Sequence, residues 1–471
     1  MSSKKKTPRS LGKIKGRKML VPKWKLFRAK EPLISVLMWG VNHTIGELMH
    51  VPPPALLLPD DFKAYSKIKV ENHCFNKDNM PSHFKVKDYC PNVFRNIRDQ
   101  FGVDQYEYLA SLTSYEPEAD APQGHRDDGG VSSSGTGGTS ASSSTNNRLF
   151  VSYDRKFLID SEAVAEIHSI LKQYHEYVVE THGKTLLPQY LGLYRITVDS
   201  SVTYLLVMRN IFGGKYNIHK KYDLKGSTIQ RQASEKEKSK ELPTLKDNDF
   251  LEDNYKLILP AEAKQQIMQL LKSDTDFLTK LRLMDYSLLV GIHDVETGMA
   301  EELKRQQKQY QQAQQQAQAQ QQQQQVTQQL VGGASALAPY SSDPDSAGED
   351  TLGTLNSTVV PTPPESPGPL AVSAFAAHTN GLNLDDEFFA IPTSPESPKK
   401  LIYFIGLVDI LTYYGVKKRT ESAAKSVKYG SEAENVSTVK PEQYARRLLE
   451  FVNRNVISPP AGGEFAPSSH V

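Results

Sequence analysis

The chain has 471 residues, a formal net charge of +2 and two cysteines, Cys74 and Cys90. Two cysteines exclude a disulfide framework and a four-cysteine zinc site, and they favour a reducing compartment. No run of about 18 apolar residues exists, and the basic N-terminus lacks the apolar core of a signal peptide. A soluble or peripheral protein is therefore expected, with about 300 folding residues in one two-lobed domain.

Residues 1–30 form a basic segment that carries twelve Lys or Arg and no acid. This asymmetry predicts a flexible arm that meets an anionic surface. The same charge fits a nuclear signal or a nucleic-acid contact, but no nucleic-acid-binding motif accompanies it, and no nucleic-acid partner is expected. Globular sequence begins at Pro32 with the apolar run 33–41, and the Gly- and Ser-rich residues 113–147 predict a disordered loop.

Order resumes with a hairpin over residues 148–159, followed by a helix and two strands. The helix has apolar residues at helical spacing, and Asp160 or Ser161 can cap its start. The strands are predicted over 191–198 and 203–212. Hairpin, helix and strands in this order are typical of the small lobe of a kinase.

A long amphipathic helix over 261–283 then leads to a short polar break that contains Asp285. A second apolar strand, 401–411, contains Asp409 as its only charge, and a basic turn upstream contains Lys225. Phosphoryl transfer needs a carboxylate near the acceptor hydroxyl, a carboxylate for a metal ion and a cation on the phosphates. These three residues supply those groups, although each taken singly also fits an ordinary turn.

Residues 297–399 change to Gln and Ala and then to Ser, Pro and Thr. They predict a disordered insertion, helical at most at its start, that leaves the flanking strands adjacent in space. Ser366, Ser394 and Ser397 each precede Pro, so they are candidate phosphorylation sites or plain linker residues. Residues 441–455 predict a short amphipathic helix, and a tail follows over 456–471.

Residues 24–120, 148–295 and 400–455 resemble the phosphatidylinositol phosphate kinase family. Within it, SVLMWGVNHTIGEL (35–48) and KELPTLKDNDF (240–250) are similar to type II, the phosphatidylinositol 5-phosphate 4-kinases. The resemblance implies an α+β, two-lobed lipid-kinase fold related to protein kinases, interrupted by the disordered Gln-, Pro- and Ser-rich insertion. The kinase domain would comprise 31–296 and 400–455, with the dimerisation region and small lobe up to about residue 212 and the large lobe after it.

The resemblance also implies the reaction, which is transfer of the ATP γ-phosphate to the 4-hydroxyl of phosphatidylinositol 5-phosphate with Mg²⁺. It implies a homodimer formed around residues 33–41 and a cytoplasmic, peripheral position on anionic inner membranes, with a nuclear pool left open. The implied site residues are Asp285 and Lys225 for catalysis, Asp409 for the metal, Arg209, Asn210 and Phe212 for the nucleotide, and Arg231, Lys417, Lys418 and Glu421 for the phosphoinositide and the membrane.

The segment 413–430, which follows Asp409, resembles the specificity loop of the family and is basic in its own right. It interleaves basic residues with Tyr and Val, and each basic group near an anionic leaflet contributes roughly 1 kcal/mol. A solvated basic loop is the alternative.

Two positions depart from the family pattern. Members carry Ile-Lys-Thr-Ile before the helix, and that lysine contacts the ATP phosphates; here Ile159 runs directly into Asp160. Loss of one fixed cation costs roughly 100-fold to 1000-fold in rate, unless a four-residue slip of the strand brings Lys156 to the same face. A catalytically weak scaffold is therefore the alternative function. The second departure is Glu421, found in the 4-phosphate 5-kinases where type II members usually carry Ala, which leaves a shifted substrate preference open.

Overall fold

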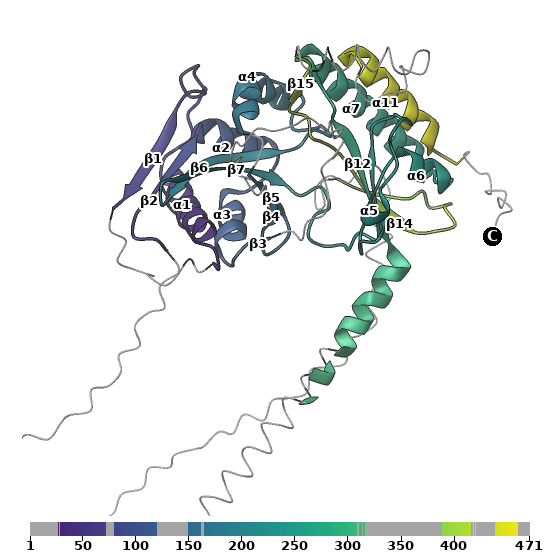
Figure 1. Cartoon of the computed structure of the whole chain (residues 1–471), viewed down its shortest axis with the longest axis horizontal. Helices are drawn as coiled ribbons and strands as arrows, with labels where there is room; N and C mark the ends of the chain where they lie inside the picture. Colours follow the sequence, from purple (N-terminus) through teal and green to yellow (C-terminus); the bar gives the residue numbers. More distant parts are fainter. Residues whose placement is uncertain are drawn as a thin grey trace, which may run out of the picture.

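The computed structural model describes residues 27, 29–71, 80–119, 149–161, 164–308, 310–312, 314–315, 389–415, 418, 420 and 439–459. These residues form a seven-stranded and a five-stranded sheet that lie side by side, with helices packed on both (Figure 1). The mixed helix and sheet composition agrees with the predicted α+β class. Nearly all of the predicted arm lies outside the described residues, but Phe27 and Ala29 at its end pack in the core.

The seven-stranded sheet has the order β1-β2-β6-β7-β5-β4-β3, and every neighbouring pair is antiparallel. Its helices cover the sheet because their apolar faces need burial; α1, for example, packs on β2 and β6. The strands are β1 (Tyr65–Val70), β2 (Phe84–Tyr89), β3 (Glu118–Ala119), β4 (Leu149–Val151), β5 (Phe157–Asp160), β6 (Tyr190–Val198) and β7 (Ser201–Arg209), and the helices are α1 (Pro32–Met49), α2 (Pro91–Gln100), α3 (Gln105–Thr113) and α4 (Val164–Glu180).

The five-stranded sheet has the order β13-β14-β12-β8-β9. Its central strands β12 and β14 are almost entirely buried, as their continuous apolar runs predict. Helices α7 and α11 pack against each other beside this sheet. The strands are β8 (Lys220–Leu224), β9 (Thr244–Leu245), β12 (Ser287–Asp294), β13 (Ala390–Pro392) and β14 (Leu401–Val408); two short ladders pair β10 (Leu257–Ile258) with β16 (Val456–Ile457) and β11 (Leu283–Met284) with β15 (Thr412–Tyr413); and the helices are α5 (Glu235–Lys238), α6 (Asp247–Glu252), α7 (Ala261–Lys280) and α11 (Pro441–Asn455).

Several predicted boundaries differ from the structure. The strand predicted over 203–212 ends at Arg209, because the chain turns at Asn210. Residues 113–119 of the predicted disordered loop are folded, since Thr113 completes α3 and residues 118–119 form β3; residues 120–147 lie outside the described residues. The predicted tail contains β16, which pairs in parallel with β10 and so belongs to the domain.

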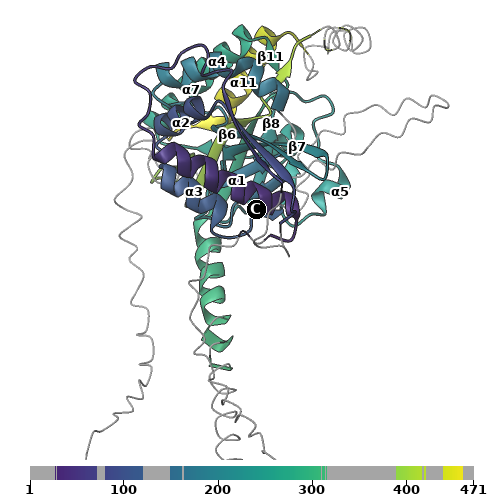
Figure 2. The same ribbon diagram turned by 90° about the vertical axis from the view of Figure 1, so that its left-hand side faces the viewer.

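Both ends of the predicted insertion are folded. A helix over residues 295–308 continues from β12 and leaves the domain in both views (Figures 1 and 2). At the other end, β13 joins the sheet, and Ser394 and Ser397 are only 2% and 6% exposed. Their burial argues against phosphorylation of these two serines in the folded protein; Ser366 lies outside the described residues.

The run 33–41, which was expected to form a dimer contact, lies in α1. Val36, Leu37, Met38 and Val41 are between 0% and 1% exposed within one chain. These side chains therefore belong to the core of the protomer, and a contact between two copies has to use other groups. Among the described residues, no helix combines the length and the apolar character that crossing a bilayer requires.

We expect the protein to be more stable near pH 5 than near pH 8, because of Asp88 on β2. Burial raises the pKa of this carboxyl from 3.8 to about 7, although Arg98 opposes the shift. The stability it contributes is present below its unfolded pKa and is lost as pH rises through about 7, by on the order of 4 kcal/mol at most. Urea midpoints at both pH values measure this, and Asp88→Asn should shrink the difference; an unchanged difference would contradict the assignment.

Candidate active site

Asp285 and Asp409 lie in a gap between two antiparallel ladders. On one side Met284 of β11 pairs with Thr412 of β15, and on the other Ser287 of β12 pairs with Val408 of β14. Asp285 and Asp409 therefore come to the same end of the five-stranded sheet. Both have left-handed backbone conformations, with φ of 65° and 58°, which Asp tolerates better than most residues and which often mark functional sites.

Lys418 is brought to Asp285 across the same gap. Its Nζ lies 2.5 Å from Asp285 Oδ2, and the two side chains are 26% and 17% exposed. An ammonium group beside a partly exposed carboxylate provides a cation and a proton acceptor at one point. The sequence placed Lys418 near the lipid, but its direct contact with Asp285 follows only from the tertiary structure.

Lys225 follows β8, whose Leu224 pairs with Leu288 of β12. This pairing places the basic turn beside the strand that begins after Asp285. The turn is held by Asp247, whose Oδ1 accepts the backbone N–H groups of Lys225 at 3.0 Å and of Gly226 at 2.7 Å. Gly226 has φ +67°, and a Cβ there would lie 2.9 Å from the Arg447 carbonyl oxygen. A larger residue would therefore displace the turn.

Arg231 does not lie at the surface in this structure. It is 3% exposed and forms ion pairs with Asp223 and, at 2.8 Å, with Asp247. The other oxygen of Asp223 accepts from Ser287 Oγ at 2.7 Å. Arg231 thus ties the basic turn to the start of β12, and this buried position does not agree with the predicted contact to lipid or membrane.

Of the three residues predicted to bind nucleotide, Arg209 ends β7, and Asn210 and Phe212 lie in the turn that follows it. Both amide hydrogens of Asn210 are used, by the carbonyls of Arg155 at 2.8 Å and Gly213 at 3.3 Å, and its Oδ1 accepts the Phe212 N–H at 3.1 Å. The Arg209 guanidinium donates to Gln189 Oε1 at 2.7 Å. The turn is therefore held rigidly by its own side chains, which suits recognition of a flat base.

Asp160 occupies the end of β5, where the family pattern continues with lysine. It pairs with Leu206 of β7 and so lies on the same sheet face as Met208 and Tyr190. Burial raises the pKa of the Tyr190 phenol well above its usual range, and the Asp409 and Asp160 carboxylates add to the effect. Asp160 thus places a carboxylate on the face where a phosphate-binding cation was expected.

The strand slip that would bring Lys156 to this face is not present. Lys156 precedes β5, and its Nζ pairs with Glu107 of α3. The hairpin turn before it is fixed by Asp154, whose Oδ1 accepts from Ser111 Oγ at 2.6 Å and from Ser152 Oγ at 2.7 Å. These bonds hold the register of the hairpin.

Asp274 of α7 links segments that belong to the two sheets. No motif in the sequence marks it as important. Its carboxylate accepts from Tyr177 of α4 at 2.7 Å, from Thr185 Oγ1 at 2.6 Å and from the Leu186 N–H at 2.7 Å. The Leu186 carbonyl in turn accepts from Leu407 of β14 at 2.7 Å. Asp274 thus fixes α4 and the segment at Leu186 relative to β14, the strand that precedes Asp409.

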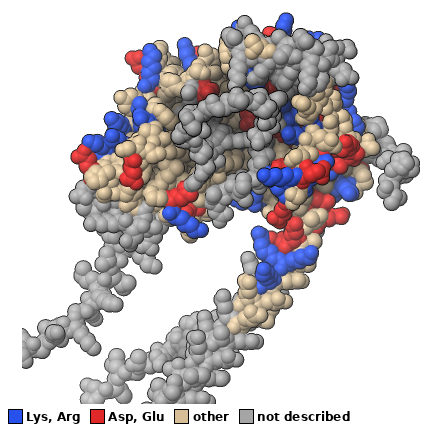
Figure 3. All heavy atoms as spheres, in the orientation of Figure 1, with Lys and Arg blue, Asp and Glu red and all other residues tan. Residues whose placement is uncertain are grey.

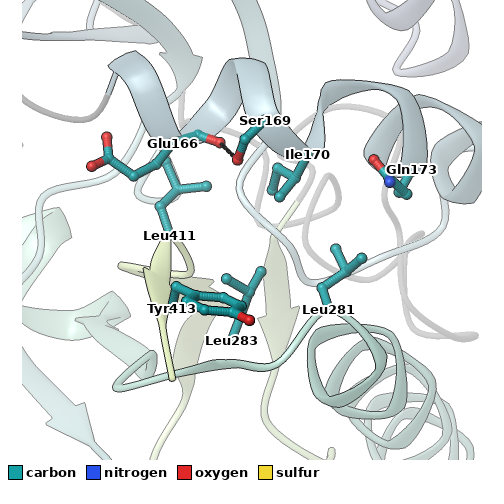
Figure 4. Close-up of a pocket in the computed structure, with 8 residues that line it drawn as sticks. All are labelled: Glu166, Ser169, Ile170, Gln173, Leu281, Leu283, Leu411 and Tyr413. Atoms are coloured by element: carbon teal, nitrogen blue, oxygen red, sulfur yellow. Dashed lines mark hydrogen bonds between the residues drawn. The ribbon is translucent and has the colours of Figure 1, made fainter. Parts of the chain in front are cut away.

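A cavity of about 270 Å³ lies between α4 and the β11·β15 ladder (Figure 4). Ser169 and Ile170 of α4 line one side, and Leu283 and Tyr413 line the other. The cavity borders the ladder that positions Asp285 but contains neither Asp285 nor Asp409.

Lys417 and Glu421 lie outside the described residues. Within the described part of the chain, no group of three or more His, Cys, Asp or Glu is arranged to hold a metal ion. A nucleotide-bound Mg²⁺ needs only one or two carboxylates, because phosphate oxygens and waters supply the other ligands. Asp409, which directly follows β14, is compatible with that requirement.

The family described as Phosphatidylinositol-4-phosphate 5-Kinase matches residues 133–455, well over half of the chain. Human phosphatidylinositol 5-phosphate 4-kinase type-2 alpha is 45% identical over 457 residues, which cover 95% of this chain and 98% of the relative. The human type-2 beta protein is 45% identical over 434 residues, 92% of each chain. A type-2 alpha protein of Gallus gallus is 45% identical over 443 residues, 93% of this chain and 95% of the relative. The chain therefore belongs to the phosphatidylinositol phosphate kinase family, alongside its type-2 5-phosphate 4-kinases.

Proposed function

We propose that this chain is a lipid kinase that transfers the γ-phosphate of ATP to the 4-hydroxyl of phosphatidylinositol 5-phosphate, making phosphatidylinositol 4,5-bisphosphate. The relatives that are 45% identical over nearly the whole chain carry the name of this activity. The observation that carries the proposal within the molecule is the contact between Lys418 and Asp285.

The chemistry of the substrate explains why this contact matters. The 5-phosphate and the 4-hydroxyl are on neighbouring carbons of the inositol ring. A cation that holds the phosphate and a carboxylate that receives the hydroxyl proton must therefore lie within a few ångströms of each other. Lys418 and Asp285 meet that requirement, and a lipid phosphate would take the place of the carboxylate as the partner of Lys418.

The remaining groups have separate roles. Asp285 orients the acceptor hydroxyl and accepts its proton, and Lys225 contributes positive charge near the phosphates. The turn at Asn210 and Phe212 receives the base. Asp409 would hold the Mg²⁺, which, when bound, neutralises charge on the transferred phosphoryl group. We also propose that the two sheets with their helices form two lobes that are related in evolution to the lobes of protein kinases.

The proposal includes a peripheral position on the cytoplasmic face of anionic inner membranes and a homodimer. The basic arm and the basic specificity loop support the membrane, because each basic group near an anionic leaflet adds roughly 1 kcal/mol. An edge strand supports the dimer. Strand β1 lies at one edge of the seven-stranded sheet, so its outer backbone groups can pair with a second copy.

One observation favours a second candidate function, a catalytically weak phosphoinositide-binding scaffold. Asp160 places negative charge on the face where the family pattern has a lysine for the ATP phosphates. Like charges repel there, so nucleotide affinity and turnover are expected to suffer while lipid binding does not.

The deciding experiment measures transfer of labelled γ-phosphate to vesicles that contain the 5-phosphate or the 4-phosphate of phosphatidylinositol. We expect the 5-phosphate lipid to be preferred, and Lys418→Gln to raise its KM by about tenfold or more, since an ion pair to the lipid phosphate is lost. Preference for the 4-phosphate lipid would mean that Glu421 dominates the choice of substrate, and it would overturn the proposal that the 5-phosphate lipid is the substrate. Lipid binding without any transfer would favour the scaffold.

A further inference from the structure

Helix α11 contacts both catalytic segments, although its sequence indicates only a short amphipathic helix. It packs along α7, the helix that precedes Asp285, as Figure 1 shows. Two of its residues, one turn apart, reach the catalytic gap. Tyr444 donates a hydrogen bond to the carbonyl of Tyr286, and Arg447 Nη2 lies 3.5 Å from the carbonyl oxygen of Lys225.

The bond from Tyr444 fixes the backbone directly after Asp285. Tyr286 lies between β11 and β12, and its carbonyl belongs to the same planar peptide unit as the N–H of Ser287, the first residue of β12. The Tyr444 ring also packs edge-on against the Tyr286 ring, with centroids 4.8 Å apart and planes at 69°. The hydroxyl and the ring of one side chain therefore hold the same residue.

The Tyr444 hydroxyl is a buried and permanent donor. Tyr444 is 0% exposed, whereas the charged side chains that Figure 3 shows are spread over the surface of the domain. Burial raises the pKa of Tyr444 well above its ordinary value, and the Asp285 carboxylate adds to the effect, so the hydroxyl keeps its proton near neutral pH. A hydrogen bond that is shielded from water is stronger than one at the surface.

Asp285 needs such support because its backbone is left-handed, with φ of 65°. Residues other than glycine keep this conformation only where neighbouring contacts impose it. On the N-terminal side of Asp285, Met284 pairs with Thr412 of β15. On the C-terminal side, the contact from Tyr444 holds Tyr286.

The same helix limits the position of the basic turn that contains Lys225. A Cβ at Gly226 would lie 2.9 Å from the carbonyl oxygen of Arg447 and 2.9 Å from the Cα of Leu448, so the turn packs directly on the backbone of α11. Tyr444 and Arg447 lie on one face of this helix. The separation between the two catalytic segments is therefore set by α11.

We propose that Tyr444 is a positioning residue for phosphoryl transfer, because its hydroxyl holds Asp285 in place relative to Lys225. The inference rests on the proposed lipid-kinase function. Transfer requires close alignment of the acceptor hydroxyl, its proton acceptor and the phosphates, and a displacement of about 1 Å costs roughly 100-fold in rate. Tyr444 acts on this alignment through the Tyr286 carbonyl.

The Tyr444→Phe variant removes the hydroxyl and keeps the ring against Tyr286. We expect kcat for transfer of labelled γ-phosphate to vesicles with the 5-phosphate lipid to fall by about tenfold, since one buried hydrogen bond is lost. The KM values for lipid and ATP should stay within about twofold, because the hydroxyl bonds to the backbone. The matched control is Tyr108→Phe on α3, which loses the contact between the buried Tyr108 hydroxyl and the Tyr194 hydroxyl at 3.2 Å. An unchanged kcat in Tyr444→Phe, or an equal fall in both variants, would overturn the proposal.

Hydrogen exchange separates this inference from the proposed function. Deuterium uptake is measured on the full-length chain in the peptide that spans residues 283–289. We expect uptake in Tyr444→Phe to be about fivefold faster than in the parent chain, and uptake in Tyr108→Phe to stay within about twofold of it. Unchanged uptake in Tyr444→Phe overturns the proposal even if turnover falls. If the parent chain transfers no phosphate to lipid, the proposed function fails, and the exchange rates still decide whether Tyr444 holds Asp285.

Discussion

Replacement of Asp285 by Asn is expected to lower the rate of phosphate transfer by about 10²-fold to 10⁴-fold, the range for a general base. The amide keeps the shape of the side chain but neither accepts the hydroxyl proton nor pairs with the Lys418 ammonium. Asn also tolerates the left-handed backbone at this position, where φ is 65°. The loss should therefore appear in kcat, without a loss of folding.

The matched control for this substitution is Asp276→Asn on α7. Asp276 is an exposed carboxylate that pairs with Lys272 of the same helix at 2.8 Å. Transfer rates are measured at saturating lipid and nucleotide, together with vesicle binding and thermal unfolding. If Asp285→Asn retains activity within about threefold of the parent, Asp285 is not the proton acceptor.

Insertion of Lys-Thr-Ile between Ile159 and Asp160 is expected to raise turnover by about 100-fold to 1000-fold. The insertion places a lysine directly after Ile159, on the sheet face that Asp160 now occupies, and moves the Asp160 carboxylate off that position. The inserted lysine then attracts the ATP phosphates at a position where the Asp160 carboxylate repels them. The added residues fall between β5 and α4, where a longer connection costs little free energy.

Three variants identify the cause of any gain. Insertion of Ala-Thr-Ile lengthens the connection without the cation, and Asp160→Lys exchanges the charge without the added length. Lys156→Ala tests the remaining nearby lysine, and it should leave nucleotide affinity unchanged because Lys156 contacts Glu107. Equal turnover by the parent and both inserted chains would mean that other cations, Lys225 or Lys418, already serve the phosphates, and the scaffold alternative would then be abandoned.

Much of this protein could be predicted from its sequence because the relevant signals are local. The apolar runs of β12 and β14, the spacing of α7 and the polar break at Asp285 are patterns of neighbouring residues, and the structure has them within a few positions. Long matching motifs likewise identified the family before any contact was known. The missing lysine after Ile159 is also a property of the chain alone.

Tertiary structure decided which charged groups meet, because those contacts join residues far apart in the chain. The sequence alone suggests that Arg231 is a surface base. In the structure it is buried, and it pairs with two carboxylates from other segments. The sequence around Ser394 and Ser397 resembles a linker, yet the neighbouring strand β13 pairs with β14 and belongs to the sheet. The contact of Lys418 with Asp285 spans 133 positions. Local sequence determines helices and strands through short-range preferences, whereas burial and ion pairing depend on the packing of the whole chain.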